Sequence, residues 1–432
     1  MSTTRYSVLV PVSNLQEAQT LLPMAEVLAQ RRGGEVLALH VVLVPPGERL
    51  SHGATNASRS RQALNNYLRQ RAEGTLPVRS MVRVTHNLWE AIWEVVLQEH
   101  VDLLLLGWTS THMPETAGGT LKNQRLLAPP CNVMFVHPRG NLTSEDERPL
   151  RILLAVRGGP NDGLALRVAE ALAASAQGEI TLLHATGEAP RDAEEYIFTH
   201  FEPALRGLRH LNRSVTVVGD VTDAISREAQ GHDIVVMGAS QHTIAPDDWR
   251  GKRLQHIREN TQATLVIVKK RAPDTGELAY EERFSTSIER PINVVVDRWF
   301  AERTFHSREF ADIEHLLRLK EQQELTISLG LPALNEEETV GNVIQTVKRA
   351  LMDDIPLLDE IVLIDSGSVD YTREIAADMG IPVYIHQEIL PAHGTYHGKG
   401  EALWKSLYVL KGDLIAWIDT DIKNIHPRFV YG

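Results

Sequence analysis

The sequence predicts an α/β protein in three parts: two tandem, doubly wound parallel-sheet domains, followed by the first half of a third α/β domain. Short, almost continuously apolar strands alternate with helical patterns, which is typical of parallel sheets covered on both faces. The order of elements restarts near Arg151, and the similar strands Asp102–Gly107 and Asp233–Gly238 begin 233 − 102 = 131 residues apart. A period of that length predicts tandem domains rather than a solenoid.

Length, composition, net charge and cysteine content limit the classes of protein to which this sequence can belong. A length of 432 residues predicts about three domains. The composition, 43% hydrophobic and 23% charged, is that of a soluble globular protein. A formal charge of −12 gives no electrostatic reason to expect a nucleic acid or membrane partner. The single cysteine, Cys131, excludes an internal disulfide framework. With no signal-peptide pattern and no long apolar run, we expect a cytoplasmic protein.

The first domain is predicted to occupy residues 1–140. Its expected strands are Val8–Val12, Val36–Val42, Val78–Val84, Asp102–Gly107 and Cys131–Val136, and its expected helices are Leu15–Arg31, Ser60–Arg71 and Leu88–Glu99. We expect Cys131 to be a buried and unreactive strand residue.

The second domain, residues 150–270, follows a polar joint at Asn141–Pro149 and repeats the order. Its expected strands are Ile152–Val156, Ile180–His184, Val215–Val218, Asp233–Gly238 and Leu265–Val268, and its first helix is Leu164–Ala174.

The Asp-apolar-Gly strand, the loop after it and the closing strand of each repeat resemble the end of a universal stress protein domain. The resemblance implies that members which bind ATP carry a Gly-x2-Gly-x9-Gly-Ser/Thr loop, whose backbone amides hold phosphates. This sequence departs from that pattern in both repeats: the first has Gly107, Ser110 and Gly118-Gly119-Thr120, and the second has Gly238, Gln241 and Gly251-Lys252. The aspartate that ends the family's first strand is also absent, with Ser13-Asn14 and Gly158-Gly159 in its place. We therefore expect weak binding of ATP or AMP at the first repeat and weaker binding at the second. A regulatory or dimerising module is favoured, and with it a homo-oligomer.

Residues 271–296 are predicted to be a linker, and residues 297–432 the third domain. A charged stretch from Ala272 to Arg283 breaks the α/β pattern. Aromatic residues cluster between Trp299 and His306, and apolar residues with helical spacing follow at Phe310, Ile313, Leu316 and Leu317. Packing onto the following domain is favoured over a direct role for His306 or His315.

The third domain begins with the strand Leu325–Leu331. Further strands are expected at Glu360–Asp365, Pro382–Ile385 and within Asp413–Ile418, with helices from Thr339, at Thr372–Met379 and at Glu401–Leu410. Ligands of open parallel sheets bind at the carboxyl ends of the strands, which is where Glu336, Asp365 and Ser366 are expected.

The run Asp419-Thr420-Asp421 carries the strongest chemical signal. Two carboxylates after a buried strand supply hard oxygen ligands for Mg²⁺ or Mn²⁺, which would neutralise a departing nucleotide diphosphate. Lys399, between two glycines before a helix, is predicted to contact phosphate. His393 and His397 lie in a glycine-rich loop without a third ligand, so we do not interpret them as a zinc site.

These motifs resemble glucosyl-3-phosphoglycerate synthases, retaining GT-A glycosyltransferases with a Rossmann-like nucleotide-binding half. The matching stretches are Leu331–Val340, Ile364–Asp370, Gly398–Leu407 and Asp419–Val430. The resemblance implies that Lys399 faces the diphosphate, Asp419 the sugar or ribose, and Asp421 the metal, and these three form the predicted catalytic group. It also implies a donor-binding group, to which we add Asp365 at the ligand edge: Pro332, Ala333, Leu334, Glu336, Asp365 and Ser366.

The predicted function is transfer of glucose, with retention, from a nucleotide-diphosphate sugar such as UDP-glucose to 3-phosphoglycerate, regulated by or assembled through the stress-protein domains. Two alternatives stay open. One is a stress-responsive nucleotide-binding regulator without transferase activity, and the other is a GT-A transferase with a mannosyl donor or a polyprenyl phosphate acceptor. The sequence ends at Gly432, soon after the metal motif. We expect it to be a fragment that is incomplete for activity, and we expect His426 to be structural.

Overall fold

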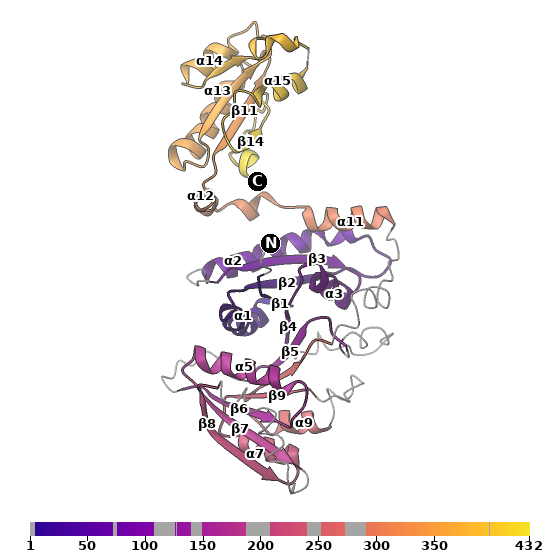
Figure 1. Cartoon of the computed structure of the whole chain (residues 1–432). Helices are drawn as coiled ribbons and strands as arrows, with labels where there is room; N and C mark the ends of the chain where they lie inside the picture. Colours follow the sequence, from indigo (N-terminus) through magenta and orange to yellow (C-terminus); the bar gives the residue numbers. More distant parts are fainter. Residues whose placement is uncertain are drawn as a thin grey trace. The chain divides into compact units, whose positions relative to one another are not determined.

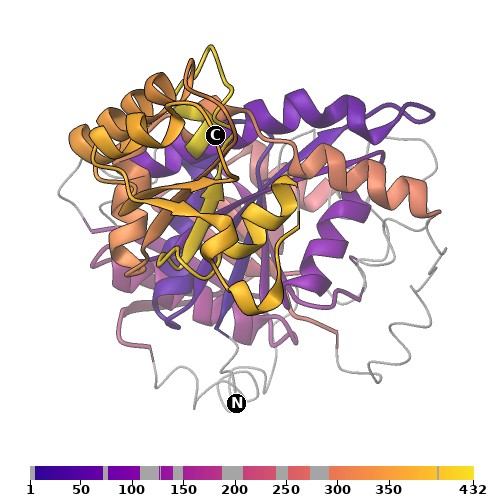
Figure 2. The same cartoon turned by 90° about the horizontal axis from the view of Figure 1, so that it is seen from above.

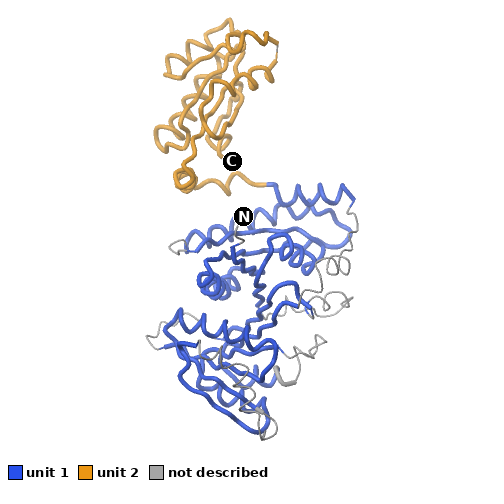
Figure 3. Tube along the Cα trace, in the orientation of Figure 1, with its two compact units in different colours: residues 1–304 blue, residues 305–432 orange. Residues whose placement is uncertain are grey.

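The computed structural model describes residues 5–71, 76–107, 126, 128–139, 149–186, 208–239, 252–272, 291–396 and 398–432. The chain divides into two compact units, residues 1–304 and residues 305–432, which Figure 3 shows in different colours.

Unit 1 is built on one ten-stranded sheet, with the order β3-β2-β1-β4-β5-β10-β9-β6-β7-β8. Its strands are β1 (Ser7–Pro11), β2 (Glu35–Leu43), β3 (Val78–Thr85), β4 (Leu103–Gly107), β5 (Asn132–His137), β6 (Arg151–Val156), β7 (Glu179–Thr186), β8 (Leu211–Val218), β9 (Ile234–Gly238) and β10 (Thr264–Lys269). Its helices are α1 (Leu15–Gln30), η1 (Leu50–Gly53), α2 (Ala54–Gln70), α3 (Leu88–Gln98), α5 (Asp162–Ser175), α7 (Val221–Ala229), α9 (Lys252–Glu259) and α11 (Ile292–Arg303).

The ten strands form two copies of one five-stranded order. β3-β2-β1-β4-β5 in the first repeat corresponds to β8-β7-β6-β9-β10 in the second, and the pairing within each copy is parallel. The two copies join through their last strands, β5 and β10, which pair antiparallel with Val136 opposite Val266. The predicted α/β class is confirmed, and the two repeats share a single sheet.

Both faces of this sheet are covered by helices, and each apolar layer extends across both repeats. One layer contains α1 and α5 with strand residues such as Leu105 and Val266. The other contains α3, α7 and α9 with residues such as Leu104 and Ile267. Because successive strand residues point to opposite faces, a continuously apolar strand serves both layers.

Local sequence sets several helix starts. The side chains of Asn14, Asn87 and Asp220 accept hydrogen bonds from backbone amides in the first turns of α1, α3 and α7. Such caps satisfy amides that have no partner inside the helix.

Helix α11 packs inside unit 1. It runs alongside α2 in Figures 1 and 2, and it also contacts η1 and β3. Our sequence-based boundary grouped residues 297–304 with the last domain, whereas the contacts of α11 place them in unit 1. The buried face of α11 combines Asp297 with Ala301, whereas Trp299 and Phe300 are exposed.

Unit 2 holds a four-stranded parallel sheet with the order β13-β12-β11-β14. The strands are β11 (Ile327–Ala333), β12 (Glu360–Asp365), β13 (Val383–Ile385) and β14 (Leu414–Trp417). The helices and turns are η2 (Ser307–Phe310), α12 (Ile313–Gln322), α13 (Val340–Lys348), η3 (Arg349–Asp354), α14 (Thr372–Asp378), η4 (His386–Glu388), η5 (Pro391–His393), α15 (Lys399–Ser406) and α16 (Arg428–Tyr431).

The helices of unit 2 cover both faces of its sheet. α13 and α14 pack with Leu329, Leu331 and Leu363 on one face. Ala402 of α15 packs with Val362 and Ile364 on the other. Because successive residues of the buried strands β11 and β12 point to opposite faces, the sheet is covered by helices on both sides, as the sequence predicts.

Some predicted features lie outside the described residues: Ser110, Gly118–Thr120, Gln241, Gly251, His397, and most of the joint 141–149 and of the linker 271–296. In the part of the chain that the structure describes, no helix is long and apolar enough to cross a membrane.

Candidate active site

The predicted donor-site residues meet at the carboxyl edge of the unit 2 sheet. β11 ends at Ala333, β12 ends at Asp365, and β14 is followed by Asp419 and Asp421. All four strands are parallel, so their carboxyl ends share one edge. Lys399 begins α15, which packs against β11 and β12.

Thr420 fixes the two aspartates. Its hydroxyl donates a hydrogen bond of 2.9 Å to the carbonyl of Pro332 in β11, and the residue is 2% exposed. Asp419 and Asp421, on either side of it, are both exposed. The middle residue of the Asp-Thr-Asp run is therefore a buried anchor between two solvent-facing carboxylates.

The strand that precedes this run lies tight against β11. Gly330 pairs with Trp417 across the β11–β14 ladder. A Cβ atom added at Gly330 would lie 2.8 Å from the Trp417 ring, which is closer than such atoms can approach. Trp417 also donates from its indole nitrogen to the hydroxyl of Ser406, at 3.0 Å, and so connects β14 to α15.

Lys399 and Asp419 form an ion pair, in which Lys399 Nζ donates to Asp419 Oδ1. Both side chains are about half exposed, at 53% and 51%. An exposed pair of this kind contributes only about 0–1 kcal/mol to stability. The structure thus brings together two of the three predicted catalytic residues, without a strong constraint between them.

The loops after β11 and β12 are held to each other by hydrogen bonds. Asn335, which has a left-handed φ of 58°, accepts from the Val369 amide at 2.9 Å, and its own amide donates to Ser368 Oγ at 2.9 Å. The Glu336 amide donates to Thr372 Oγ1 at 2.7 Å. These hydrogen bonds fix the backbone of the two loops that carry the predicted nucleoside-binding residues.

Two buried or half-buried carboxylates shape the same loops. Asp365 is fully buried and accepts hydrogen bonds from the amides of Gly367 and Ser368 at 2.8–3.2 Å. For Asp370, burial by itself raises the pKa, but hydrogen bonds from the Thr372 hydroxyl and amide and from the Glu337 amide outweigh it. The pKa of Asp370 is therefore lowered.

The predicted donor-binding residues differ in their exposure to solvent. Pro332 and Ala333 are buried in β11, whereas Leu334 is 52% exposed. Glu336 and Ser366 are half-buried. The Ser366 amide donates to the Ala333 carbonyl at 2.9 Å, so the ends of β11 and β12 are joined there. Asp365 is turned into its own loop, which makes it a positioning residue in this structure.

Lys405 is a residue of this region that the sequence analysis did not identify. It is fully buried, and its Nζ donates to the carbonyl of Gly394 at 2.9 Å and lies 3.1 Å from Glu401 Oε1. A buried lysine must be paired, so this contact ties the 394 loop to α15. The Glu401–Lys405 spacing of four residues was the signal that could have revealed the pair.

The carboxylates fit a divalent cation that is shared with phosphate. No group of three or more His, Cys, Asp or Glu side chains is arranged for a metal within the described ranges. Mg²⁺ commonly uses one or two carboxylates and completes its shell with phosphate oxygens and water. Asp419 and Asp421 match that donor set, with Asp421 as the predicted ligand.

The two repeats of unit 1 hold a second feature of chemical interest. In the loop after β6, Asp162 accepts hydrogen bonds from the amides of Arg157, Gly158 and Gly159 at 2.8–2.9 Å. A Cβ atom at Gly238, the glycine that ends β9, would lie 2.8 Å from Asp162 Oδ1. A carboxylate of the chain itself therefore occupies amides that could otherwise bind an anion.

The first repeat has a related arrangement, with one loop amide and one hydroxyl in place of three amides. Glu17 of α1 accepts from the amide and the hydroxyl of Ser13, at 2.8 and 2.6 Å. A Cβ atom at Gly107 would lie 2.4 Å from Glu17 Oε1. Glu17 and Asp162 are 7% and 5% exposed. In both repeats, a carboxylate of the first helix thus contacts the loop that follows the first strand.

Comparisons with known proteins agree with the motifs. Residues 5–137 match the model of the Universal stress protein family, and residues 328–424 match Glycosyl transferase family 2. The family model thus matches one stress protein domain, whereas we predicted two from the sequence; the second repeat shares its strand order.

Known relatives match the C-terminal part of the chain. The glucosyl-3-phosphoglycerate synthase of Petrotoga mobilis is 55% identical over 130 residues, which are 30% of this chain and 40% of the relative. The crystal structure of glucosyl-3-phosphoglycerate synthase from Mycobacterium tuberculosis with Mn²⁺, UDP-glucose and phosphoglyceric acid is 42% identical, covering 27% of this chain and 40% of that one, with a TM-score of 0.25. Mannosyl-3-phosphoglycerate synthase from Rubrobacter xylanophilus is 39% identical, covering 31% and 42%, with a TM-score of 0.30. The chain spans about 40% of the length of these relatives.

Proposed function

We propose that unit 2 binds a nucleotide-diphosphate sugar, UDP-glucose, and serves in the transfer of glucose to 3-phosphoglycerate with retention. The observation that carries the proposal is the ion pair of Lys399 with Asp419 at the carboxyl edge of the sheet, where Asp421 follows on the other side of the anchored Thr420. The 55% identity to a glucosyl-3-phosphoglycerate synthase over this region supports the choice of donor and acceptor.

Each residue has a role that follows from its chemistry. Asp421, with Asp419 beside it, would hold Mg²⁺ or Mn²⁺, which neutralises the charge that develops on the leaving diphosphate. Lys399 adds a positive charge at the start of α15, and its exposed pair with Asp419 leaves it able to turn to a phosphate oxygen. Thr420 keeps both carboxylates at the edge through its bond to Pro332.

Donor binding tests this proposal. We expect calorimetry to show UDP-glucose binding that is strengthened by Mn²⁺ and weakened by EDTA. Asp421→Asn should reduce the affinity in Mn²⁺ by about tenfold or more, because it removes a metal ligand. Asp378→Asn makes the same charge change at the exposed last residue of α14 and should leave the affinity unchanged. Equal affinity in Mn²⁺ and EDTA would contradict the metal role of Asp421.

The alternatives give different outcomes in the same assays. Preference for GDP-mannose over UDP-glucose would indicate a mannosyl donor, and transfer to a polyprenyl phosphate rather than to 3-phosphoglycerate would indicate a lipid acceptor. Failure to bind any nucleotide sugar would leave a regulatory protein.

We also propose that the stress-type repeats act as a scaffold rather than as a nucleotide site. The support is that Glu17 and Asp162 already occupy loop amides in both repeats. ATP that remained bound through purification would overturn this part of the proposal.

A further inference from the structure

Helix α11 contacts the first repeat through a face that carries most of its buried charged residues. Asp297 is 9% exposed, and the side chains of Arg298 and Glu302 are each 13% exposed. On the opposite face, Ile292, Trp299 and Phe300 are 82%, 62% and 52% exposed. Ala301 on the buried face packs with Val82 and Val84, so this face combines a small apolar contact with charged groups, while the large apolar side chains of α11 face outward.

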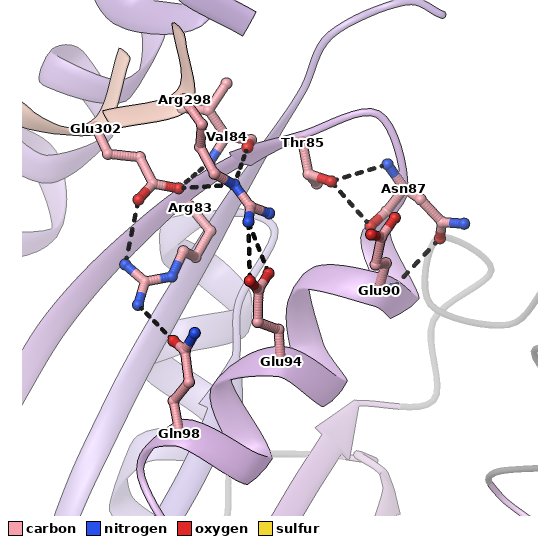
Figure 4. Close-up of polar contacts among 9 residues, drawn as sticks. All are labelled: Arg83, Val84, Thr85, Asn87, Glu90, Glu94, Gln98, Arg298 and Glu302. Carbon is pink, nitrogen blue, oxygen red and sulfur yellow. Dashed lines mark hydrogen bonds and ion pairs between the residues drawn. The ribbon is translucent and has the colours of Figure 1, made fainter. Parts of the chain in front are cut away.

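Two side chains of α11 contact the backbone of the edge strand β3, as Figure 4 shows. Glu302 Oε1 accepts from the Val84 amide at 3.0 Å, and Arg298 Nε donates to the Val84 carbonyl at 3.1 Å. β3 is the last strand in the sheet order, so these groups have no neighbouring strand on that side. Covering them with side chains satisfies an edge that could otherwise pair with another chain.

Charged side chains of α11 face side chains of the opposite charge on the first repeat. Arg298 Nη1 donates to both carboxylate oxygens of Glu94, at 3.0 and 2.8 Å, and Glu302 lies 3.4 Å from Arg83 (Figure 4).

Two further sets of contacts hold the middle and the C-terminal end of the helix. Asp297 accepts from Arg49 and from the Ser51 amide at 3.0–3.2 Å. Arg61 donates to the carbonyls of Glu302 and Thr304, at 3.0 and 2.8 Å. The chain is therefore fixed up to Thr304, the last residue of unit 1.

The second repeat reverses the charge at the position that corresponds to Glu94. Asn87 and Asp220 are equivalent residues, since each caps the helix that follows the edge strand of its repeat. Glu94 lies 94 − 87 = 7 residues after the first cap, and Arg227 lies 227 − 220 = 7 residues after the second. An arginine there would repel Arg298, and Thr216 replaces Arg83 four residues before the cap.

We propose that the β3–α3 surface of the first repeat is a specific receptor for α11, selected by the Glu94–Arg298 pair, and that Arg227 excludes the helix from the second repeat. The partner is a segment of this chain, the helix that leads directly into unit 2. The receptor recognises the pattern Asp297-Arg298-x3-Glu302 on one helix face. This inference does not depend on the proposed glycosyltransferase function.

Hydrogen exchange of the full chain tests the proposal. Glu94→Arg should speed exchange of the α11 amides by about tenfold or more, because a partly buried charge pair becomes a repulsion. Arg227→Glu is the matched control in the second repeat and should leave α11 exchange unchanged. Amides of β4 and α3, read in the same experiment, report whether the variant is folded.

A double variant in which the two charges are swapped separates charge recognition from simple loss of packing. Glu94→Arg combined with Arg298→Glu should exchange more slowly at α11 than Glu94→Arg alone. Unchanged α11 exchange in Glu94→Arg, with β4 still protected, would overturn the proposal. The proposal would also be overturned if the α11 amides of the double variant exchanged as fast as the added effects of the two single variants predict.

Discussion

At the scale of single residues, the thiol of Cys131 shows what burial does to chemistry. The residue is 2% exposed, and desolvation raises its pKa to about 12. The thiolate is the reactive form, so the folded protein should not react with iodoacetamide at pH 8, and denaturant should expose the thiol. Rapid alkylation of the native chain would contradict the burial of Cys131.

The raised pKa of Cys131 also determines how the free energy of unfolding should change with pH. The unfolded thiol has its ordinary pKa of 9.0, whereas burial raises the pKa of the folded thiol to about 12. Between these values the unfolded state binds fewer protons, so the free energy of unfolding should fall as the pH rises from about 9 to about 12. A Cys131→Ala variant should lack this contribution in urea unfolding measured across that range.

Residue patterns also show how far sequence-based prediction reaches. The position of Asp419, Asp421 and Lys399 near one edge of the sheet could be predicted because strand ends and helix starts define that edge, whereas their catalytic role stays a prediction. The roles of Glu17 and Asp162 were not predicted: the sequence shows that the strand-ending aspartate is missing, but not which side chain replaces it. Replacement depends on how a helix packs over a loop, and spacing alone does not report that.

At the scale of elements, α15 depends on a buried ion pair. Lys405→Met should remove the bond to Gly394 and leave the Glu401 carboxylate, which is 10% exposed, without its partner. Breaking a buried pair costs about 3–5 kcal/mol. We expect a lower melting temperature for unit 2 and faster hydrogen exchange in residues 391–406, with partial recovery in Lys405→Met combined with Glu401→Leu. No change in either measurement would show that the pair is dispensable.

Element boundaries were predicted well where periodicity was strong, and less well where charge decides the packing. The expected strand Val78–Val84 is β3, Val78–Thr85, and the expected helix Leu88–Glu99 is α3, Leu88–Gln98. Residues of α11 were grouped with the last domain because their aromatic content resembles it. Their place in unit 1 depends on partners such as Arg49 and Glu94, more than 200 residues away in the chain, which no local pattern reveals.

At the scale of the whole molecule, we expect the two repeats to unfold as one cooperative unit. They share the sheet through β5 and β10, and both apolar layers run across that junction. Because the pairing is intramolecular, the unfolding temperature of unit 1 should not change over a hundredfold dilution. Val266→Asp in β10 should destabilise both repeats together. Separate melting of the first and second repeats, followed by hydrogen exchange, would contradict this.

The junction of β5 and β10 also bears on solubility. Two separate five-stranded sheets would present four edges, whereas the joined sheet presents two, β3 and β8. The α11 helix covers part of the β3 edge at Val84. A chain cut between the repeats would expose β5, whose Val133, Met134, Phe135 and Val136 are buried in the intact protein. An exposed apolar edge strand is a template for aggregation, so covalent continuity between the repeats protects each from self-association.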